Sequence, residues 1–280
     1  MPCLNEEASV RQAMDSTLQA FDAYKLDGEL IVVNDGSNDT TRVVVEECAR
    51  LDSRIRLLNH DRPLGIGRSF FDGVQLANKE FVTMFPGDNE NDPMDALTYI
   101  SIARDVDIIV PFIHNVEIRS RMRRLTSALY RLIINISFGM NLNYTNGTVI
   151  YNTMVLRGIK PSAQGFFYQA EILIRLIRQG YLYAETPHFL ADRSSSKSKA
   201  LSLKSLRDVT LAYLHLMADV HLFRRVGATD QPLYPASATL RRVREYSRVD
   251  QVASLPDDAP IIPVAPVSTR RELLKENVDG

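Results

Sequence analysis

The sequence has few of the residues that build disulfide frameworks and zinc sites. It contains two cysteines, Cys3 and Cys48, and five histidines, none at metal-ligand spacing. This scarcity excludes a disulfide-rich domain and favours a reducing cytoplasm. The sequence also lacks any apolar run near the roughly 20 residues of a membrane span. Met1 is followed by proline and acidic residues rather than by the basic and apolar stretch of a signal peptide.

An excess of charge of one sign is missing as well. Lys and Arg together number 33 and Asp and Glu 34, which gives a net charge of -1 over 280 residues. This balance does not indicate nucleic acid as a partner. With 45% hydrophobic residues, the chain can bury one substantial core.

Strand-like and helix-like segments alternate in the first part of the chain. Apolar runs predict strands at 28–35, 54–60, 80–85 and 106–113. Helical spacing of apolar residues predicts helices at 6–24, 39–51, 64–78 and 93–103, with Asn5 as the first N-cap. Four such units predict an α/β fold, with a mostly parallel central sheet and helices on both faces. Pro2 stands where the strand before the first helix would end, so we expect the first strand to be missing.

Seven segments, in this order, resemble those of family 2 glycosyltransferases, which have the GT-A fold. They are PCLNEE (2–7), VVNDGSNDTT (32–41), LGIGRSFFDGVQLAN (64–78), FPGDNENDP (85–93), NYTNGTVIY (143–151), GFFYQAEILIRLIRQGYLYAETP (165–187) and DRSSSKSK (192–199). The last three are similar to the branch that contains dolichyl-phosphate mannose synthase. The resemblance covers about residues 2–217. It implies transfer of a sugar from a nucleotide-diphosphate sugar to a polyprenyl (dolichyl or undecaprenyl) phosphate, with inversion.

Polar residues at the strand ends predict the nucleotide site, because ligands of such sheets bind outside the carboxyl ends of the strands. Asn34 and Asp35 can hydrogen bond to the edge of a base, and an Asx turn at the start of the next helix is the structural alternative. Glycines 65 and 67 would permit close approach of the backbone to a ligand. With the residues that the resemblance adds, the predicted nucleotide-binding set is Pro2, Asn5, Glu6, Asn34, Asp35, Gly65 and Gly67.

A cluster of carboxylates follows the strand at 80–85. Asp88 and Glu90 lie two residues apart, and their oxygens would suit Mg²⁺ or Mn²⁺ bound to a departing diphosphate. A solvated acidic turn that caps the next helix is the alternative. The Asp-x-Asp motif of the family falls on Pro86 and Asp88. We therefore predict Asp88 and Glu90 as an altered metal-binding pair.

Five arginines lie at the start of, or within, an apolar helix-like segment at 118–140: Arg119, Arg121, Arg123, Arg124 and Arg131. A guanidinium binds phosphate oxygens through two hydrogen bonds, and an amphipathic helix can lie in a membrane interface. A solvated helix face is the alternative. The residues predicted to hold the acceptor phosphate are Arg119, Arg123, Ser127 and Arg131.

The polar loop at 192–199 completes the predicted site. The resemblance implies that Arg193 and Lys199 contact phosphate and act with Asp88 in catalysis. Glu171 also matches a glutamate of the family, although a single carboxylate on a helix is more typical of a local salt bridge. No histidine or aspartate is needed as a strong base, because a phosphate acceptor is already ionised at neutral pH.

The composition changes after residue 217, where prolines and charges mix with isolated apolar residues. We expect a GT-A domain at 1–226 and a partly disordered tail at 227–280. The protein is expected in the cytoplasm, peripheral to the inner face of the membrane. Two other functions stay open: transfer to a polysaccharide or another soluble acceptor, and a catalytically silent relative that binds nucleotide or lipid.

Overall fold

The computed structural model of the chain describes residues 1–159, 161–163, 165, 167–188, 203–223 and 233–253. The chain divides into two units, Met1–Arg241 and Arg242–Gly280, and the strands all lie in the first. The strands are β1 (Pro2–Cys3), β2 (Leu30–Asn34), β3 (Ile55–Asn59), β4 (Phe81–Val82), β5 (Ile108–Ile113), β6 (Ile150–Asn152) and β7 (Tyr183–His188). The α-helices are α1 (Val10–Ala23), α2 (Thr41–Leu51), α3 (Ile66–Leu76), α4 (Pro93–Leu97), α5 (Arg121–Phe138), α6 (Thr153–Arg157), α7 (Tyr168–Arg178), α8 (Leu203–Met217) and α9 (Ala238–Ala253). Short helical turns are η1 (Ile100–Arg104), η2 (Val116–Ile118) and η4 (Ala218–Leu222).

The strands form two hydrogen-bonded sheets. Three strands pair in parallel in the order β1-β2-β3. Four strands follow the order β4-β6-β5-β7, in which β5 and β7 are parallel and β6 is antiparallel to both of its neighbours. A backbone hydrogen bond of 3.0 Å from the Gly87 nitrogen to the Pro2 oxygen links the two sheets. The predicted, mostly parallel α/β arrangement is confirmed, with β6 as the antiparallel exception.

The strand expected to be missing is represented by two residues. Pro2 and Cys3 form β1, which pairs with β2 at Val33 and Asn34. Two residues are too few to show any periodicity in the sequence, so the pattern of apolar residues gave no sign of this strand.

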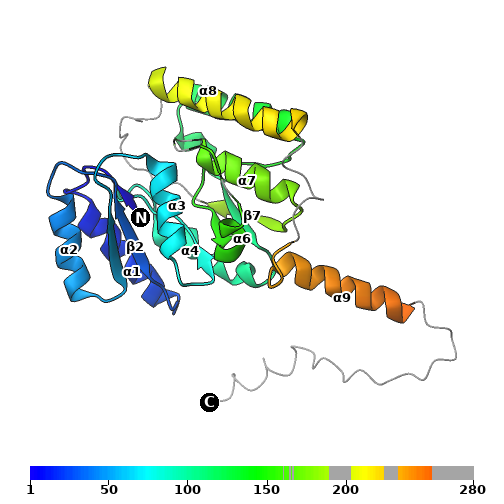
Figure 1. The fold of residues 1–280 in the computed structure, drawn as a ribbon, viewed down its shortest axis with the longest axis horizontal. Coiled ribbons are helices and arrows are strands. Elements are labelled where there is room, and N and C mark those ends of the chain that lie inside the picture. Colours follow the sequence, from blue (N-terminus) through cyan, green and yellow to red (C-terminus); the bar gives the residue numbers. More distant parts are fainter. Residues whose placement is uncertain (160, 164, 166, 189–202, 224–232, 254–280) are drawn as a thin grey trace, which may run out of the picture. The chain divides into compact units, whose positions relative to one another are not determined.

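Helices cover both faces of the parallel sheet (Figure 1). On one face α1 packs against α2 and α4, and on the other α3 contacts α6, which contacts α7. Strand β2 explains this arrangement, because successive side chains of a strand point to opposite faces. Val32 is buried in the cluster with α1 and α2, whereas Val33 and Ile31 face Gly73 of α3.

The first helix starts later than its sequence predicts. α1 begins at Val10 after Ser9, so the prediction of Asn5 as its N-cap is wrong. Asn5 instead has a backbone φ of 56°, and its side-chain oxygen accepts a hydrogen bond of 2.9 Å from the Asn38 nitrogen. The Asn5 side chain therefore hydrogen bonds to the loop after β2 instead of capping α1.

The segment expected to begin a disordered tail is partly built into the first unit. The carboxylate of Asp107, just before β5, accepts hydrogen bonds from the backbone nitrogens of Ala238 (2.8 Å) and Thr239 (3.0 Å). Thr239 also accepts a hydrogen bond of 2.7 Å from the Leu182 nitrogen, next to β7. These bonds fix the start of α9 against the second sheet, which composition alone does not predict.

Candidate functional site

The turn after β1 and the loop after β2 lie against each other at the carboxyl ends of these strands. The Asn5 nitrogen donates to Ser37 Oγ over 2.9 Å, in addition to the bond from Asn38 to the Asn5 side chain. The Glu6 nitrogen donates to Thr41 Oγ1 over 2.8 Å. The structure thus brings the predicted residues Asn5 and Glu6 together with the loop that carries Asn34 and Asp35.

The segment after β4 joins the same edge of the sheet. Ser9 Oγ donates to the Gly87 oxygen over 2.9 Å, and the Gly87 nitrogen donates to Pro2. A β-carbon at Gly87 would collide with the sulfur of Cys3, so any other residue there would force the Cys3 side chain to move. This close approach places Asp88, the next residue, beside the ends of β1 and β2.

Asp35 is the centre of a buried hydrogen-bond network. Its carboxylate accepts hydrogen bonds from His60 Nδ1 (2.8 Å) and from the backbone nitrogens of Leu64 and Gly65 (2.9 Å each). Burial acts to raise the pKa of Asp35, but these hydrogen bonds outweigh it and lower the pKa below its ordinary value. Gly65, with φ of 100°, and the buried Gly67 start α3 behind this carboxylate. Contact of these residues with a nucleotide stays a prediction.

Replacing Asp35 by Asn should lower the free energy of unfolding by about 2 kcal/mol at pH 7, because an amide cannot accept hydrogen bonds at both positions. Because the folded-state pKa is lowered, this stabilisation is present above about pH 4 and is lost as the pH falls through the folded value. Urea unfolding at pH 7 and at pH 3 measures the effect, with Asp61→Asn, an exposed residue of the same loop, as the control. If Asp35→Asn lowers the free energy of unfolding equally at pH 7 and pH 3, the predicted role of the Asp35 carboxylate is wrong.

Asn34 bridges two strand ends from a buried position. Its side-chain nitrogen donates to Asn59 Oδ1 over 2.9 Å, and its oxygen accepts from the Ser37 nitrogen over 3.3 Å. Side-chain bonding of this kind fixes the conformation of the turn. Recognition of a base by Asn34 stays a prediction.

The acidic segment forms a tight turn. The Glu90 nitrogen donates to Asp88 Oδ1 over 3.0 Å, and Asn89 between them has a φ of 57°. Asp88 is half-buried and Glu90 is exposed. Asp92 caps α4 by accepting from the Met94 nitrogen over 2.9 Å. The described residues contain no group of three or more His, Cys, Asp or Glu side chains that could hold a metal ion. A two-carboxylate turn suits a hard cation that takes its remaining oxygens from a diphosphate and water.

The segment at 143–148 connects the acidic turn with the arginines. Thr148 Oγ1 donates to Asn91 Oδ1 over 3.5 Å, and Arg131 donates to the Asn143 oxygen over 3.3 Å. The Arg119 guanidinium lies 5.6 Å from the centre of the Tyr144 ring and donates to its hydroxyl over 3.4 Å. The residues at 143–148 had no predicted role, because none of their side chains is charged.

Arg119 has an unused donor at this position. Its Nε atom is buried and has no hydrogen-bond partner among the described residues. Buried donors in proteins are normally paired, so this Nε is available to a hydrogen-bond acceptor from outside the described residues. The exposed Arg123 and the half-buried Ser127 lie on the first turns of α5.

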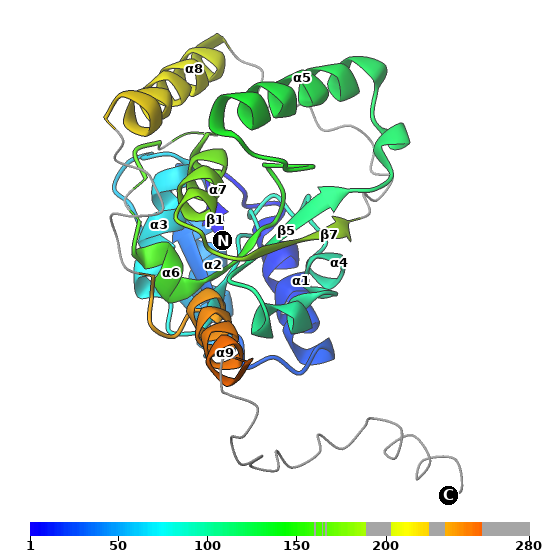
Figure 2. The same cartoon turned by 90° about the vertical axis from the view of Figure 1, so that its right-hand side faces the viewer.

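The helices α5 and α8 lie side by side (Figure 2), and Ser137 and Tyr213 join them by a hydrogen bond of 2.7 Å. Much of their apolar surface is uncovered, as at Ile136, which is 74% exposed. The exposed apolar side chains are Met122, Leu125, Leu129, Leu132, Ile133, Ile136, Leu206, Leu211, Leu214, Leu222 and Phe223, which we name the α5–α8 apolar surface. No helix in the described part of the chain is long and apolar enough to cross a membrane. Exposed apolar side chains gathered on neighbouring helices are typical of an interaction site.

Glu171 forms the local salt bridge that its position on a helix suggests. It is 1% exposed, accepts from Arg175 over 2.8 Å and also accepts from the backbone nitrogens of Ser162 and Ala163. Arg175 in turn contacts Asp219 over 2.9 Å. The salt-bridge interpretation is confirmed, and the network ties α7 to the turn after α8.

Two predicted catalytic residues, Arg193 and Lys199, lie outside the described residues. Two histidines near the strand ends were not predicted. His60 binds Asp35 with one ring nitrogen and lies 3.2 Å from Asp72 with the other. His188, at the end of β7, is paired with Asp95 of α4. His60 ends the strand predicted at 54–60, which is the signal that could have identified it, whereas no strand was predicted at His188.

The sequence profile of glycosyl transferase family 2 matches residues 1–163, which is more than half of the chain. The chain therefore belongs to this family.

Two relatives are similar in sequence to part of the chain. Dodecaprenyl-phosphate galacturonate synthase of Rhizobium johnstonii is 27% identical over 164 residues, covering 57% of this chain and 48% of the relative. Undecaprenyl-phosphate 4-deoxy-4-formamido-L-arabinose transferase of Shewanella sediminis is 25% identical over 144 residues, covering 51% and 44%. The matches span less than half the length of either relative.

Solved structures share the fold. Glucosyl-3-phosphoglycerate synthase from Mycobacterium tuberculosis with Mn²⁺, UDP and phosphoglyceric acid has a TM-score of 0.56 at 19% identity, covering 77% of this chain and 76% of that chain. The same enzyme with Mg²⁺ and UDP has a TM-score of 0.58 at 20% identity, covering 78% and 77%. The predicted GT-A fold is confirmed.

Proposed function

We propose that the chain transfers a sugar from a nucleotide-diphosphate sugar to a polyprenyl phosphate, with inversion at the anomeric carbon. The observation that carries this proposal is the segment at 143–148, which contacts the acidic turn at one end and Arg119 and Arg131 at the other. A donor diphosphate and an acceptor phosphate must meet at one centre. The two relatives, a dodecaprenyl-phosphate galacturonate synthase and an undecaprenyl-phosphate 4-deoxy-4-formamido-L-arabinose transferase, support this acceptor class.

The donor binds where the ends of β1, β2 and β4 meet. Asn34 hydrogen bonds to the base, and Asp35 acts by holding the loop that leads to Gly65 and Gly67. Pro2, Asn5 and Glu6 supply the opposite wall. This placement rests on the hydrogen bonds between the two loops and on the rule that ligands of such sheets bind at the carboxyl ends of the strands.

Asp88 and Glu90 hold a divalent cation, Mg²⁺ or Mn²⁺. When bound, the cation neutralises the negative charge that develops on the departing diphosphate. Two carboxylates from one turn suffice for this purpose, because Mg²⁺ in particular is commonly bound through one or two carboxylates together with substrate phosphates. Asp88 is the more important of the two, because it is half-buried beside Gly87.

The acceptor reacts without a strong general base. A phosphate oxygen attacks the anomeric carbon opposite the diphosphate, a new carbon–oxygen bond forms, and the bond to the diphosphate breaks with its electron pair. The acceptor phosphate is ionised at neutral pH, so it has no proton that a base must remove. We place Arg193 and Lys199 against the leaving diphosphate.

The acceptor phosphate binds beside Tyr144. Two observations support this position. Arg119 and Arg131 both hydrogen bond to the segment at 143–148, and the Nε of Arg119 has no hydrogen-bond partner among the described residues. Arg123 and Ser127 extend it along the first turns of α5. The prenyl chain then leaves along the α5–α8 apolar surface, which rests on the membrane interface. In this proposal the membrane face is the inner, cytoplasmic one.

Replacing Arg119 by Ala should raise the apparent KM for a short, water-soluble prenyl phosphate about tenfold, because one charge-assisted contact is lost. Binding of the donor nucleotide should not change. Steady-state kinetics with a fixed donor concentration measures the first quantity and calorimetry the second. Arg124→Ala is the matched control, because Arg124 is an exposed arginine of the same segment. Equal effects of the two substitutions would argue against an acceptor site at Arg119.

The wild-type protein should sediment with vesicles that contain anionic lipid, and less so as salt increases. Replacing Leu129 by Glu on the α5–α8 apolar surface should reduce the bound fraction about tenfold, because a charge would enter the interface. Thr126→Glu is the control, because it adds the same charge to α5 at an exposed polar position. A wild type that stays in solution with these vesicles would refute the membrane placement.

A soluble acceptor is the second candidate, since structures of the fold neighbour contain phosphoglyceric acid. Transfer to a small phosphorylated acid, together with no transfer to prenyl phosphate, would favour it. Binding of nucleotide without transfer to either acceptor would instead favour a silent relative.

A further inference from the structure

His60, the residue after β3, contacts both Asn34 and Asp35 at the end of β2. Its backbone nitrogen donates to the Asn34 oxygen over 2.9 Å, and its ring Nδ1 lies 2.8 Å from Asp35 Oδ1. The residue before it, Asn59, accepts the hydrogen bond from the Asn34 side chain. The ring of His60 is buried, with 8% of the side chain exposed. One short segment therefore fixes both residues, although His60 has no part in the function proposed above.

The ring of His60 is anchored through Nδ1. Burial acts to raise the pKa of the Asp35 carboxyl, but its hydrogen bonds lower that pKa below the ordinary value. The carboxylate is therefore ionised at neutral pH and accepts a hydrogen bond from Nδ1. The other ring nitrogen, Nε2, lies 3.2 Å from Asp72 Oδ2 but is not aligned for a hydrogen bond. Asp72 is instead held by Arg68 over 2.7 Å.

The loop that follows His60 lies directly on the turn after β2. Gly36 in this turn has a φ of 71°, and a β-carbon there would lie 2.6 Å from the backbone of Arg62. The same Asp35 carboxylate that binds His60 also accepts from the Gly65 nitrogen over 2.9 Å. One carboxylate therefore holds the loop at both ends, and loss of the bond from His60 would free the end nearer to β3.

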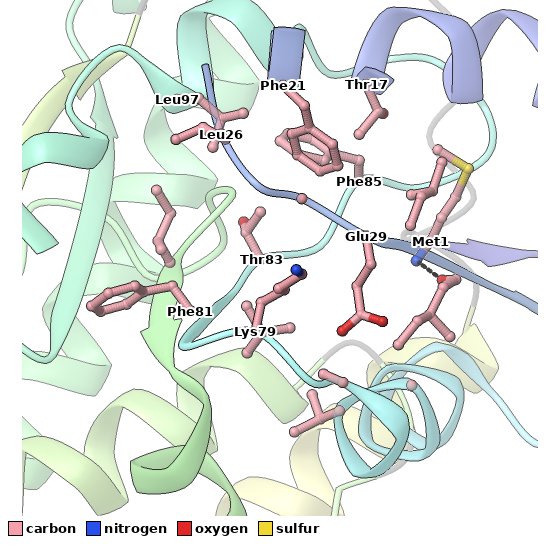
Figure 3. Close-up of a pocket in the computed structure, with 18 of the residues that line it drawn as sticks. Met1, Thr17, Phe21, Leu26, Glu29, Lys79, Phe81, Thr83, Phe85 and Leu97 are labelled. Atoms are coloured by element: carbon pink, nitrogen blue, oxygen red, sulfur yellow. Dashed lines mark hydrogen bonds between the residues drawn. The ribbon is translucent and has the colours of Figure 1, made fainter. Parts of the chain in front are cut away.

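A cavity interrupts the packing between β2 and α3 (Figure 3). Its volume is about 370 Å³, and its walls include Val33 of β2, Gly73 of α3, and Phe21 and Thr83. Side chains around a void lack partner atoms on one side and lose those van der Waals contacts. Packing therefore holds α3 less firmly beside the cavity, and its position depends more on the hydrogen bonds at the strand ends.

From these contacts we infer that His60 is a positioning residue of the donor site. Its Nδ1 hydrogen bond keeps Asp35 turned toward the loop that leads to Gly65. Its backbone hydrogen bond keeps Asn34 at the end of β2, where that side chain meets the base. His60 acts through these residues and does not itself touch the substrate. The inference rests on the proposed function, because it takes this end of the sheet as the nucleotide site.

Three variants of the full chain separate the roles of the two ring nitrogens. The side-chain nitrogen of Asn can replace Nδ1, that of Gln reaches about as far as Nε2, and Ala replaces neither. Calorimetry with UDP, GDP, ADP, CDP and dTDP, each with Mn²⁺, measures Kd. His60→Gln and His60→Ala should raise Kd about tenfold, because a charge-assisted hydrogen bond is lost, whereas His60→Asn should stay within about threefold of the wild type. His215→Ala, at an exposed histidine of α8, is the control and should leave Kd unchanged.

Hydrogen exchange at the amides of Leu64 and Gly65 tests the same contact without any substrate. Both amides should exchange at least about tenfold faster in the Gln and Ala variants than in the wild type and the Asn variant. Equal exchange in all four proteins, or equal Kd values for the Asn and Gln variants, would overturn the inference. If exchange follows the expected order but the wild type binds none of the five nucleotides, the proposed donor site, on which the inference rests, is wrong.

Discussion

Asp88→Asn should reduce sugar transfer at least about hundredfold and remove its dependence on divalent cations. The amide keeps an oxygen that can accept the hydrogen bond from the Glu90 nitrogen, so the turn should survive. The negative charge is what the substitution removes. Initial rates over a range of Mg²⁺ and Mn²⁺ concentrations measure the effect.

Asp92→Asn provides the comparison for this prediction. Asp92 belongs to the same acidic segment but caps α4, and Asn is also a good capping residue. We expect transfer to be nearly unchanged and the free energy of unfolding to fall by at most about 1 kcal/mol. If the Asp88 and Asp92 variants behave alike, the acidic segment is a solvated turn and the metal assignment is wrong.

Glu171→Ala should destabilise the protein by about 3 to 5 kcal/mol. The substitution removes one of the two carboxylates that pair with the buried Arg175 guanidinium. It also removes the acceptor for the backbone nitrogens of Ser162 and Ala163. Urea unfolding at constant pH measures the loss. The binding of donor nucleotide should be unchanged in the fraction that stays folded, because Glu171 forms a structural salt bridge.

The control is a second Arg–Glu pair with the same spacing on a helix. Arg42 and Glu46 of α2 are 2.7 Å apart, but their side chains are 61% and 35% exposed. Glu46→Ala should therefore change the free energy of unfolding by less than about 1 kcal/mol. A similar loss in the two variants would mean that burial does not decide the strength of these pairs.

The order of strands and helices was predictable because it depends on local apolar periodicity. Residues 28–35 and 106–113 each contain a run of apolar residues, and both contain the strands expected. The antiparallel direction of β6 was not predictable, because three residues carry no directional signal. The start of α9 was also missed, since its anchor, Asp107, lies more than a hundred residues earlier in the chain.

The residues of the candidate site also divide into those that could be predicted from the sequence and those that could not. Asn34, Asp35 and Asp88 could be placed from sequence because they lie at or after the ends of predicted strands, and the structure gathers their segments at one edge of the sheet. The internal hydrogen bonds of Asp35 depend on Leu64 and Gly65, which only the folded chain brings near. Tyr144 carries no charge and lies in a loop, so its contact with Arg119 had no signal in the sequence.

The most direct test of the proposed function is mass spectrometry of the lipid product. The purified chain would be incubated with Mn²⁺ or Mg²⁺, a panel of nucleotide sugars and a short polyprenyl phosphate. We predict a new lipid whose mass equals that of the acceptor plus one sugar residue, formed together with a nucleoside diphosphate and absent with Asp88→Asn. A full panel without glycosylated lipid, from protein that binds both nucleotide and vesicles, would contradict transfer to a polyprenyl phosphate.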